Sequence, residues 1–110
     1  MDEREKRLAQ NEALFREVNE KVETIAAQHG DDDHIYEFYC ECSNADCTLH
    51  VPATLGAYEQ VRAYSNRFLI FPGHALPDIE NVLERGEGHW VVEKTGDAAS
   101  YVSRLDPRQR

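Results

Sequence analysis

The sequence lacks a long apolar run, and this absence excludes a membrane-spanning helix. None of its apolar stretches approaches the roughly 20 residues that a helix needs to cross a bilayer. The 110 residues are 41% hydrophobic and 30% charged, a composition that fits one folded domain rather than wholesale disorder. Residues 2–6 are all charged and show no secretory signal, so we expect a cytoplasmic protein.

Basic charge is scarce as well. The formal net charge is −9, which argues against a protein that binds the phosphate backbone of nucleic acids, because such a protein needs a basic face. Between Val22 and Val61 there is no Lys or Arg, and all three cysteines fall within this acidic stretch. An odd number of cysteines in a chain that we expect to be cytoplasmic argues against a disulfide framework. The cysteines therefore require another explanation.

Motifs of the common enzyme classes are absent too. There is no glycine-rich phosphate loop, since Gly86 and Gly88 fit a turn, and neither the HExxH motif nor the zinc-deaminase pattern occurs. Cys47 could form a nucleophile pair with His50 or His74, but nothing in the sequence supplies an oxyanion hole or an orienting residue. These absences favour a protein without enzymatic activity.

Residues 1–30 are predicted to be an N-terminal segment whose amphipathic helix spans residues 2–28. Gly30 stands where a helix stop is expected, and the acids at 31–33 follow it. An apolar stripe at helical spacing runs along the helix, with Asn11 in its one gap; its members are Leu8, Phe15, Val18, Val22 and Ile25. Two hypotheses stay open. The stripe packs on its own domain, or it forms a coiled-coil seam for a homodimer or a protein partner, with Asn11 setting the register.

Residues 31–105 are predicted to form a compact domain, and the chain as a whole an α+β fold with a long N-terminal helix, short strands and two short helices. Strands are expected at 34–39, 49–51, 67–71, 82–84 and 89–94, with a helical alternative for 79–85. Thr54 is expected to cap one short helix, and residues 97–105 to form the other. Residues 106–110 are predicted to be a frayed tail.

Four basic residues in the second half of the chain could form a small patch: Arg62, Arg67, Arg85 and Lys94. We interpret them as surface charges paired with Glu59, Glu84 and Glu93. A DNA-binding regulator that uses this patch is the alternative, although the net charge of the chain argues against it.

The cysteines carry the clearest chemical signal. Cys40, Cys42 and Cys47 have the spacing C-x-C-x4-C, and three thiolates on one tight loop can converge on a soft, tetrahedral cation, for which zinc is the usual occupant. The turn-forming residues Ser43, Asn44 and Asp46 allow the chain to wrap back on itself. The sequence therefore predicts that 31–105 is a zinc-binding α+β domain with one Zn²⁺ per chain.

A fourth ligand has to come from elsewhere in the chain. His74 is the first choice, because a Pro-Gly turn at the end of a strand can present its imidazole rigidly. His50 is the second choice, and His34 and His89 follow. On chemistry alone, His74 and His50 are not separated.

Four protein ligands would close the site, leave no position for an activated water, and give zinc a structural role. Our main hypothesis is a small zinc-binding, non-enzymatic regulatory or adaptor protein that acts through protein–protein contacts. The alternatives are a thiol-based redox sensor with a labile zinc site, a small zinc metalloenzyme with an open site, and cysteines that are simply buried apolar side chains. The acidic surroundings favour zinc over redox chemistry, because a reactive thiol is normally activated by a nearby cation.

Two resemblances extend this interpretation. The eight residues from Cys40 to Cys47 resemble the post-SET zinc motif of histone lysine methyltransferases, in which a distant cysteine completes the site; this implies only that the spacing can hold zinc. The region of about 36–107 resembles a group of small uncharacterised actinobacterial proteins, in the segments 37–42, Cys47, 57–62, 67–68, 71–74, 91–94 and 106–108. The second resemblance implies that the cysteines and the Pro-Gly-His turn belong to one module, which supports His74 as their partner.

Overall fold

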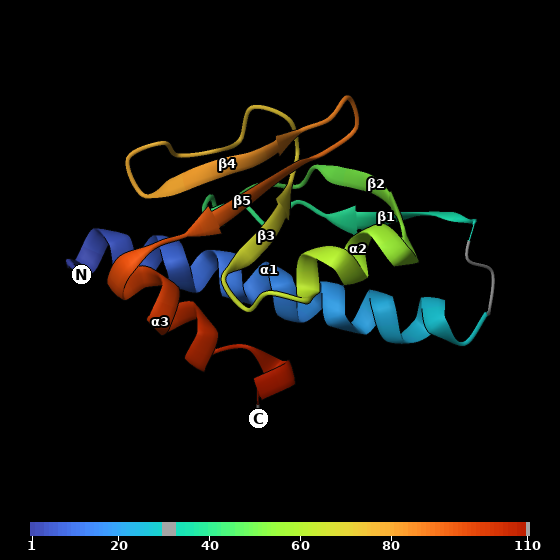
Figure 1. Ribbon diagram of the computed structural model, residues 1–110, viewed down its shortest axis with the longest axis horizontal. Coiled ribbons are helices and arrows are strands. Elements are labelled where there is room, and N and C mark those ends of the chain that lie inside the picture. The colour runs from blue at the N-terminus through green and yellow to red at the C-terminus, as the bar shows by residue number, and fades with distance from the viewer. Residues whose placement is uncertain (30–32, 110) are drawn as a thin grey trace.

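The computed structural model describes residues 1–29 and 33–109 and has an α+β architecture (Figure 1). In chain order the elements are α1 (Glu3–Ala27), β1 (Ile35–Tyr39), β2 (His50–Thr54), α2 (Leu55–Arg62), β3 (Arg67–Ile70), β4 (Glu80–Arg85), β5 (Trp90–Lys94), α3 (Gly96–Arg104) and the short 3-10 helix η1 (Pro107–Gln109). The predicted fold class is confirmed. Among the residues described, none of the helices is both long and apolar enough to cross a membrane.

Helix α1 begins after Asp2, whose carboxylate accepts a hydrogen bond from the Glu5 amide at 2.7 Å and caps the first turn. At about 1.5 Å per residue, the helix runs along most of the 42 Å long axis of the molecule. It ends at Ala27 with Gln28 as its C-cap, so the predicted span of 2–28 is right to within one residue at each end. The predicted stop at Gly30 and most of the acidic break at 31–33 lie outside the described residues.

The face of α1 that is buried is not the predicted apolar stripe. Ile25 of that stripe is 59% exposed, and its other apolar members are only half-buried. The buried positions are instead small or polar: Ala9, Glu12, Ala13, Arg16, Asn19 and Ala26. Helix α1 therefore packs on its own domain mainly through alanines that allow close approach and through polar side chains with specific partners, while Val22 of the predicted stripe also packs against the core.

Two antiparallel sheets lie on α1 (Figure 1). Strands β1 and β2 form a hairpin in which Phe38 pairs with Val51, and the second sheet has the order β3-β5-β4. The β4–β5 hairpin carries a bulge between Val82 and Glu84, and the helical alternative for residues 79–85 is wrong. Thr54 caps α2 as predicted, since its hydroxyl accepts a hydrogen bond from the Ala57 amide at 3.1 Å.

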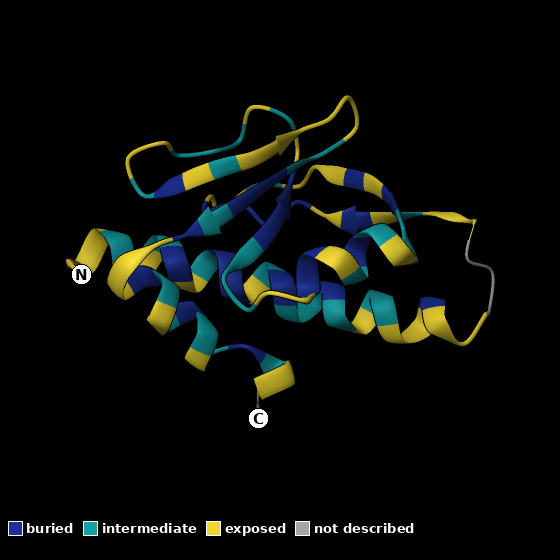
Figure 2. Cartoon of the chain, viewed as in Figure 1, coloured by how far each residue is buried: buried dark blue, intermediate teal, exposed yellow. Residues whose placement is uncertain are grey.

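The core lies between the sheets and the helices (Figure 2). Phe38 of β1 and Tyr58 of α2 stack there with ring centroids 4.4 Å apart and planes at 13°. They are fully buried, together with Val51, Phe68, Leu69, Ile70, Val92 and Val102. Burial of these side chains, at about 25 cal/mol per Å² of apolar surface, is the main force that joins the β1–β2 hairpin to the rest of the fold.

The interpretation of all four basic residues as surface charges is wrong for two of them. Lys94 is 1% exposed, and its ammonium lies 2.6 Å from Glu12 Oε1 and 3.2 Å from Glu80 Oε2. Arg62 is 4% exposed and forms ion pairs with Asp106 and with Glu20. Helix α1 supplies one acid to each of these cations, so buried ion pairs replace much of the hydrophobic contact that an amphipathic helix usually makes.

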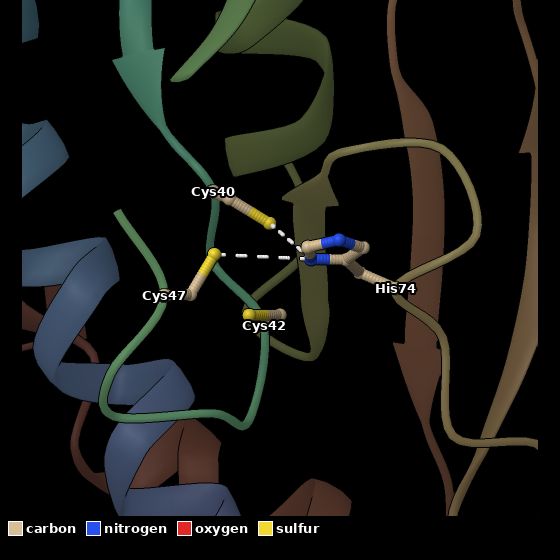
Figure 3. A group of neighbouring side chains, drawn as sticks. All are labelled: Cys40, Cys42, Cys47 and His74. Carbon is tan, nitrogen blue, oxygen red and sulfur yellow. Dashed lines mark hydrogen bonds between the residues drawn. The ribbon is translucent and has the colours of Figure 1, made fainter. Parts of the chain in front are cut away.

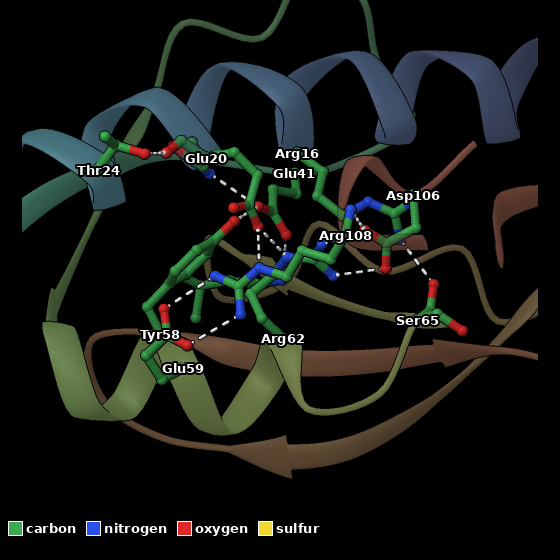
Figure 4. A network of polar contacts seen from close by, with 12 residues as sticks. Arg16, Glu20, Thr24, Glu41, Tyr58, Glu59, Arg62, Ser65, Asp106 and Arg108 are labelled. Atoms are coloured by element: carbon green, nitrogen blue, oxygen red, sulfur yellow. Dashed lines mark hydrogen bonds and ion pairs between the residues drawn. The ribbon is translucent and has the colours of Figure 1, made fainter. Parts of the chain in front are cut away.

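The predicted frayed tail is also wrong for Asp106–Gln109, which the structure shows to be held in place. Asp106 is 1% exposed and accepts hydrogen bonds from the Arg62 guanidinium and from the Arg108 amide. Arg108 in turn forms a bidentate pair with Glu59 of α2, with distances of 2.8 and 2.9 Å (Figure 4). Fraying of the terminus would remove Asp106 from the buried Arg62 guanidinium and leave that guanidinium with Glu20 as its remaining acidic partner.

Candidate metal centre

The cysteine loop begins directly after β1 and returns to β2. Its two ends are joined by the Cys40 amide, which donates to the Leu49 carbonyl at 3.1 Å. Within the loop, the Asn44 side-chain oxygen accepts from the Asp46 amide at 3.0 Å, and its carbonyl accepts from the Cys47 amide at 3.0 Å. This turn at Asn44 brings Cys47 back toward Cys40 and Cys42, as the turn-forming residues predicted.

His74 reaches the same place from the end of β3. The amide of His74 donates to the Phe71 carbonyl at 3.1 Å, which closes a four-residue turn with Pro72 at its second position and Gly73 at its third. Gly73 has φ 87°, a left-handed conformation that a type II turn requires and that only glycine adopts without strain. The predicted Pro-Gly turn thus positions the imidazole of His74.

The structure brings Cys40, Cys42, Cys47 and His74 together, with one ligand atom from each and all four atoms within 4.8 Å of one another (Figure 3). The Cys40 and Cys47 sulfurs lie 3.7 and 3.8 Å from His74 Nδ1. A tetrahedral zinc with bonds of about 2.3 Å to sulfur and 2.0–2.1 Å to nitrogen separates such atoms by about 3.6 Å. The four side chains therefore fit one tetrahedral metal ion with little movement.

The surroundings of the cluster suit anionic sulfur. The Phe71 amide donates to Cys40 Sγ at 3.1 Å, and such outer-shell donors stabilise thiolate ligands and orient them. Cys40 and Cys42 are buried, whereas Cys47 and His74 are half-buried, so one edge of the cluster is open to solvent. His50 is not part of the cluster; its ring packs on Tyr39 with centroids 4.8 Å apart. His34 packs on Tyr36, and His89 also lies outside the cluster.

Without a metal, the three thiols share their charge unequally. The hydrogen bond from Cys40, aided by His74, lowers the pKa of Cys42 to about 5, although burial opposes this shift. The same hydrogen bond to Cys42, together with burial, raises the pKa of Cys40, and burial raises the pKa of Cys47. The site thus holds one thiolate readily, and further thiolates need a compensating cation.

Glu41, which lies between two of the cysteines, is the functional residue that sequence reasoning missed. It lies in the acidic stretch between Val22 and Val61 and no role is predicted for it there, yet it is 0% exposed. Its carboxylate accepts hydrogen bonds from the Leu69 amide at 2.9 Å, the Tyr58 hydroxyl at 2.7 Å and the Asn19 amide group at 2.9 Å. Burial raises the pKa of Glu41, while these hydrogen bonds and the charge of Arg62 oppose the shift. No local signal in the sequence marks this residue, because its partners come from three distant elements.

Glu41 also ties the loop to the larger sheet through its backbone, since its amide donates to the Leu69 carbonyl at 2.8 Å. At Leu69, on the free edge of β3, the backbone carbonyl and amide are thus both satisfied by Glu41. In this way Glu41 fixes the segment Cys40–Cys42 against β3, whose end carries the turn with His74.

The fold and the site together define a small α+β protein with a cluster of three cysteines and one histidine that could hold a metal ion. Comparison with protein-family models, with curated proteins and with solved structures finds no match for this chain. The resemblance to small actinobacterial proteins therefore stays a prediction, and the argument for function rests on the geometry of the cluster.

Proposed function

We propose that this chain is a small zinc-binding protein in which Cys40, Cys42, Cys47 and His74 hold one Zn²⁺. The observation that carries the proposal is the convergence of four ligand atoms, delivered by two loops far apart in the sequence, to within 4.8 Å. Thiolate and imidazole ligands in a tetrahedral arrangement select zinc over hard cations such as Mg²⁺ or Ca²⁺.

The role that this geometry supports is structural. The ion would join the β1–β2 hairpin to the end of β3, two parts of the chain that otherwise meet through the core and through Glu41. Zinc contributes about 10–16 kcal/mol in small zinc-binding peptides, against total stabilities of about 5–15 kcal/mol for a domain. Four protein ligands fill the coordination sphere and leave no position for a reactive water, so we propose no catalysis at the metal.

Metal content of the purified full-length protein, measured by elemental mass spectrometry, tests the proposal. We expect about one zinc per chain, and Cys42→Ser should abolish stoichiometric binding and lower the melting temperature steeply. His74→Ala and His50→Ala form a matched pair, because only His74 lies in the cluster. His74→Ala should weaken zinc binding at least tenfold and His50→Ala should not. Three thiols that titrate freely in a metal-free native protein would refute the assignment.

We also propose that the protein acts in regulation or as an adaptor, through contacts made by the outward face of α1. What supports this is that Leu14 and Ile25 on that helix are 58% and 59% exposed, while its opposite face is already engaged. The molecule that would bind this outward face of α1 is a protein partner or a second copy of the chain. Sedimentation of the wild type and of a Leu14→Glu/Ile25→Glu variant tests whether the chain forms a homodimer through this face, since that association should disappear in the variant. A wild type that stays monomeric at high concentration would rule out the homodimer.

A redox sensor with labile zinc is the second candidate, and the half-buried position of Cys47 at the open edge of the cluster favours it. Hydrogen peroxide would take two electrons from a pair of these thiols, form one disulfide and two waters, and leave too few thiolates to hold the ion. Zinc that stays bound under mild peroxide would reject this candidate while leaving the structural role intact.

A further inference from the structure

The cysteine loop is in direct contact with helix α1 through side-chain amides. The Asn19 amide nitrogen donates to the Tyr39 carbonyl at 2.8 Å and to Glu41 Oε2 at 2.9 Å, and the Tyr39 amide donates back to Asn19 Oδ1 at 2.8 Å. Two turns earlier on the helix, the amide group of Asn11 donates to the Ser43 carbonyl at 2.8 Å. Asn19 is 0% exposed, so these bonds are made in the interior. Helix α1 therefore holds the loop on both sides of Cys40.

The partners of these bonds can keep their positions only while the loop keeps its conformation. Glu41 lies between two of the cluster residues, and in an extended segment its side chain points away from those of Cys40 and Cys42. When the Cys40 and Cys42 sulfurs are held as metal ligands, the position of the Glu41 carboxylate between them is therefore fixed as well. Asn19 can form its hydrogen bond only if the carboxylate stays at that position. An unconstrained loop that shifts by about 1 Å takes these bonds outside their normal range.

The rest of the α1 contact is also largely polar. Its buried face consists of three alanines and of Glu12, Arg16 and Asn19, so most of its specificity comes from directional polar contacts rather than from large apolar side chains. Glu12 pairs with Lys94, and Arg16 donates to the Ser65 and Val102 carbonyls, so contacts outside the cysteine loop also hold the helix. Docking of α1 thus depends on the geometry of its polar partners, and several of these belong to the cysteine loop.

We propose that occupancy of the metal centre controls the docking of α1 on the domain, with Asn19 and Glu41 as the positioning residues that connect the two. The inference rests on the proposed binding of zinc. Zinc holds the loop in the conformation that presents the Tyr39 carbonyl and the Glu41 carboxylate to Asn19, and loss of zinc weakens the docking of the helix. Because such coupling is reciprocal, weakening the docking of α1 weakens the affinity for the metal by the same factor.

Asn19→Ala and Asn66→Ala provide a matched comparison in the full-length chain. Each removes a side-chain amide that donates to a backbone carbonyl, but Asn19 is fully buried and bonded to Tyr39, whereas Asn66 is half-buried and donates to Lys94 at 3.0 Å. Zinc affinity is measured by competition with a chelator. We expect Asn19→Ala to lower the affinity about tenfold and Asn66→Ala to leave it within twofold of the wild type. Equal affinities for the two variants would overturn the proposal.

Hydrogen exchange of the wild-type protein, with zinc and after its removal by EDTA, tests the coupling without any substitution. We expect the amides of residues 9–19 to exchange at least tenfold faster after removal, while those of β5, held by β3 and β4, keep their protection. Unchanged exchange in α1, or an equal loss in α1 and β5, would overturn the coupling. Zinc content is measured on the same samples: protein that never binds zinc refutes the proposed function, whereas zinc-loaded protein whose α1 does not respond refutes this inference alone.

Discussion

Replacing Lys94 by methionine is the sharpest test of the buried charges under α1. The ammonium of Lys94 lies 2.6 Å from Glu12 and 3.2 Å from Glu80, and none of the three residues is more than 5% exposed. Glu80 has a second partner, since its other oxygen accepts from the Leu76 amide at 2.8 Å. Lys94→Met keeps the apolar stem and removes the cation, which leaves two facing carboxylates without compensation.

The expected cost follows from that geometry. Removing one partner of a buried ion pair costs about 3–5 kcal/mol, a large part of the about 5–15 kcal/mol that stabilises a typical domain. For a chain of this size, the loss should lower the melting temperature by more than about 10 °C. The double variant Glu12→Gln/Lys94→Met is the control. It removes one of the two carboxylates, and should be more stable than Lys94→Met alone.

The effect should also depend on pH. Burial of Glu12, together with repulsion from Glu80, raises its pKa well above 4.5 even with Lys94 present. A carboxyl group whose pKa is raised in the folded state stabilises the fold when protonated, and this contribution is lost as the pH rises from about 4.5 through the folded-state pKa. Without Lys94 the pKa rises further, so the penalty should be larger at pH 8 than at pH 5.

Urea unfolding of both variants and of the wild type at these two pH values measures the difference directly. A penalty below about 1 kcal/mol at pH 8 would refute the reasoning, because it would mean that the pair contributes no more than an exposed one. A penalty that shrinks with rising pH would equally contradict it.

Two further predictions concern the tail and the histidine turn. Asp106→Asn should cost about 3 kcal/mol, and between pH 5 and pH 2 the variant should lose less stability than the wild type. The reason is that hydrogen bonds from Arg62 outweigh burial and hold the pKa of Asp106 below 3.8, so its contribution is present above that value and is lost on acidification. Gly73→Ala forces a side chain into φ 87° and should cost about 1 kcal/mol and weaken zinc binding, measured by unfolding and chelator competition. Gly56→Ala in α2, where a Cβ meets open space, is the control and should lower neither quantity.

Local patterns sufficed for most of the helices and strands and for the three cysteines of the cluster. Capping by Thr54, the turn at residues 72–74 and the spacing of the three cysteines are short-range features, because the residues that determine them are neighbours in the chain. Reasoning from local patterns could not choose between His74 and His50 as the fourth ligand. Both histidines suit a metal by chemistry, and only the path of the chain between β1 and β3 brings one of them to the sulfurs.

The sequence by itself determined the α+β class, the long first helix and the group of residues suited to a soft metal ion, because periodicity, caps and donor chemistry act over a few residues. Only the tertiary structure decided which charges are buried. Lys94, Arg62 and Glu41 resemble ordinary surface residues in the sequence, and the polar partners that they meet in the interior lie at least 14 positions away. A charged side chain is buried only where a polar or oppositely charged partner lies in contact with it, and that contact depends on the whole fold.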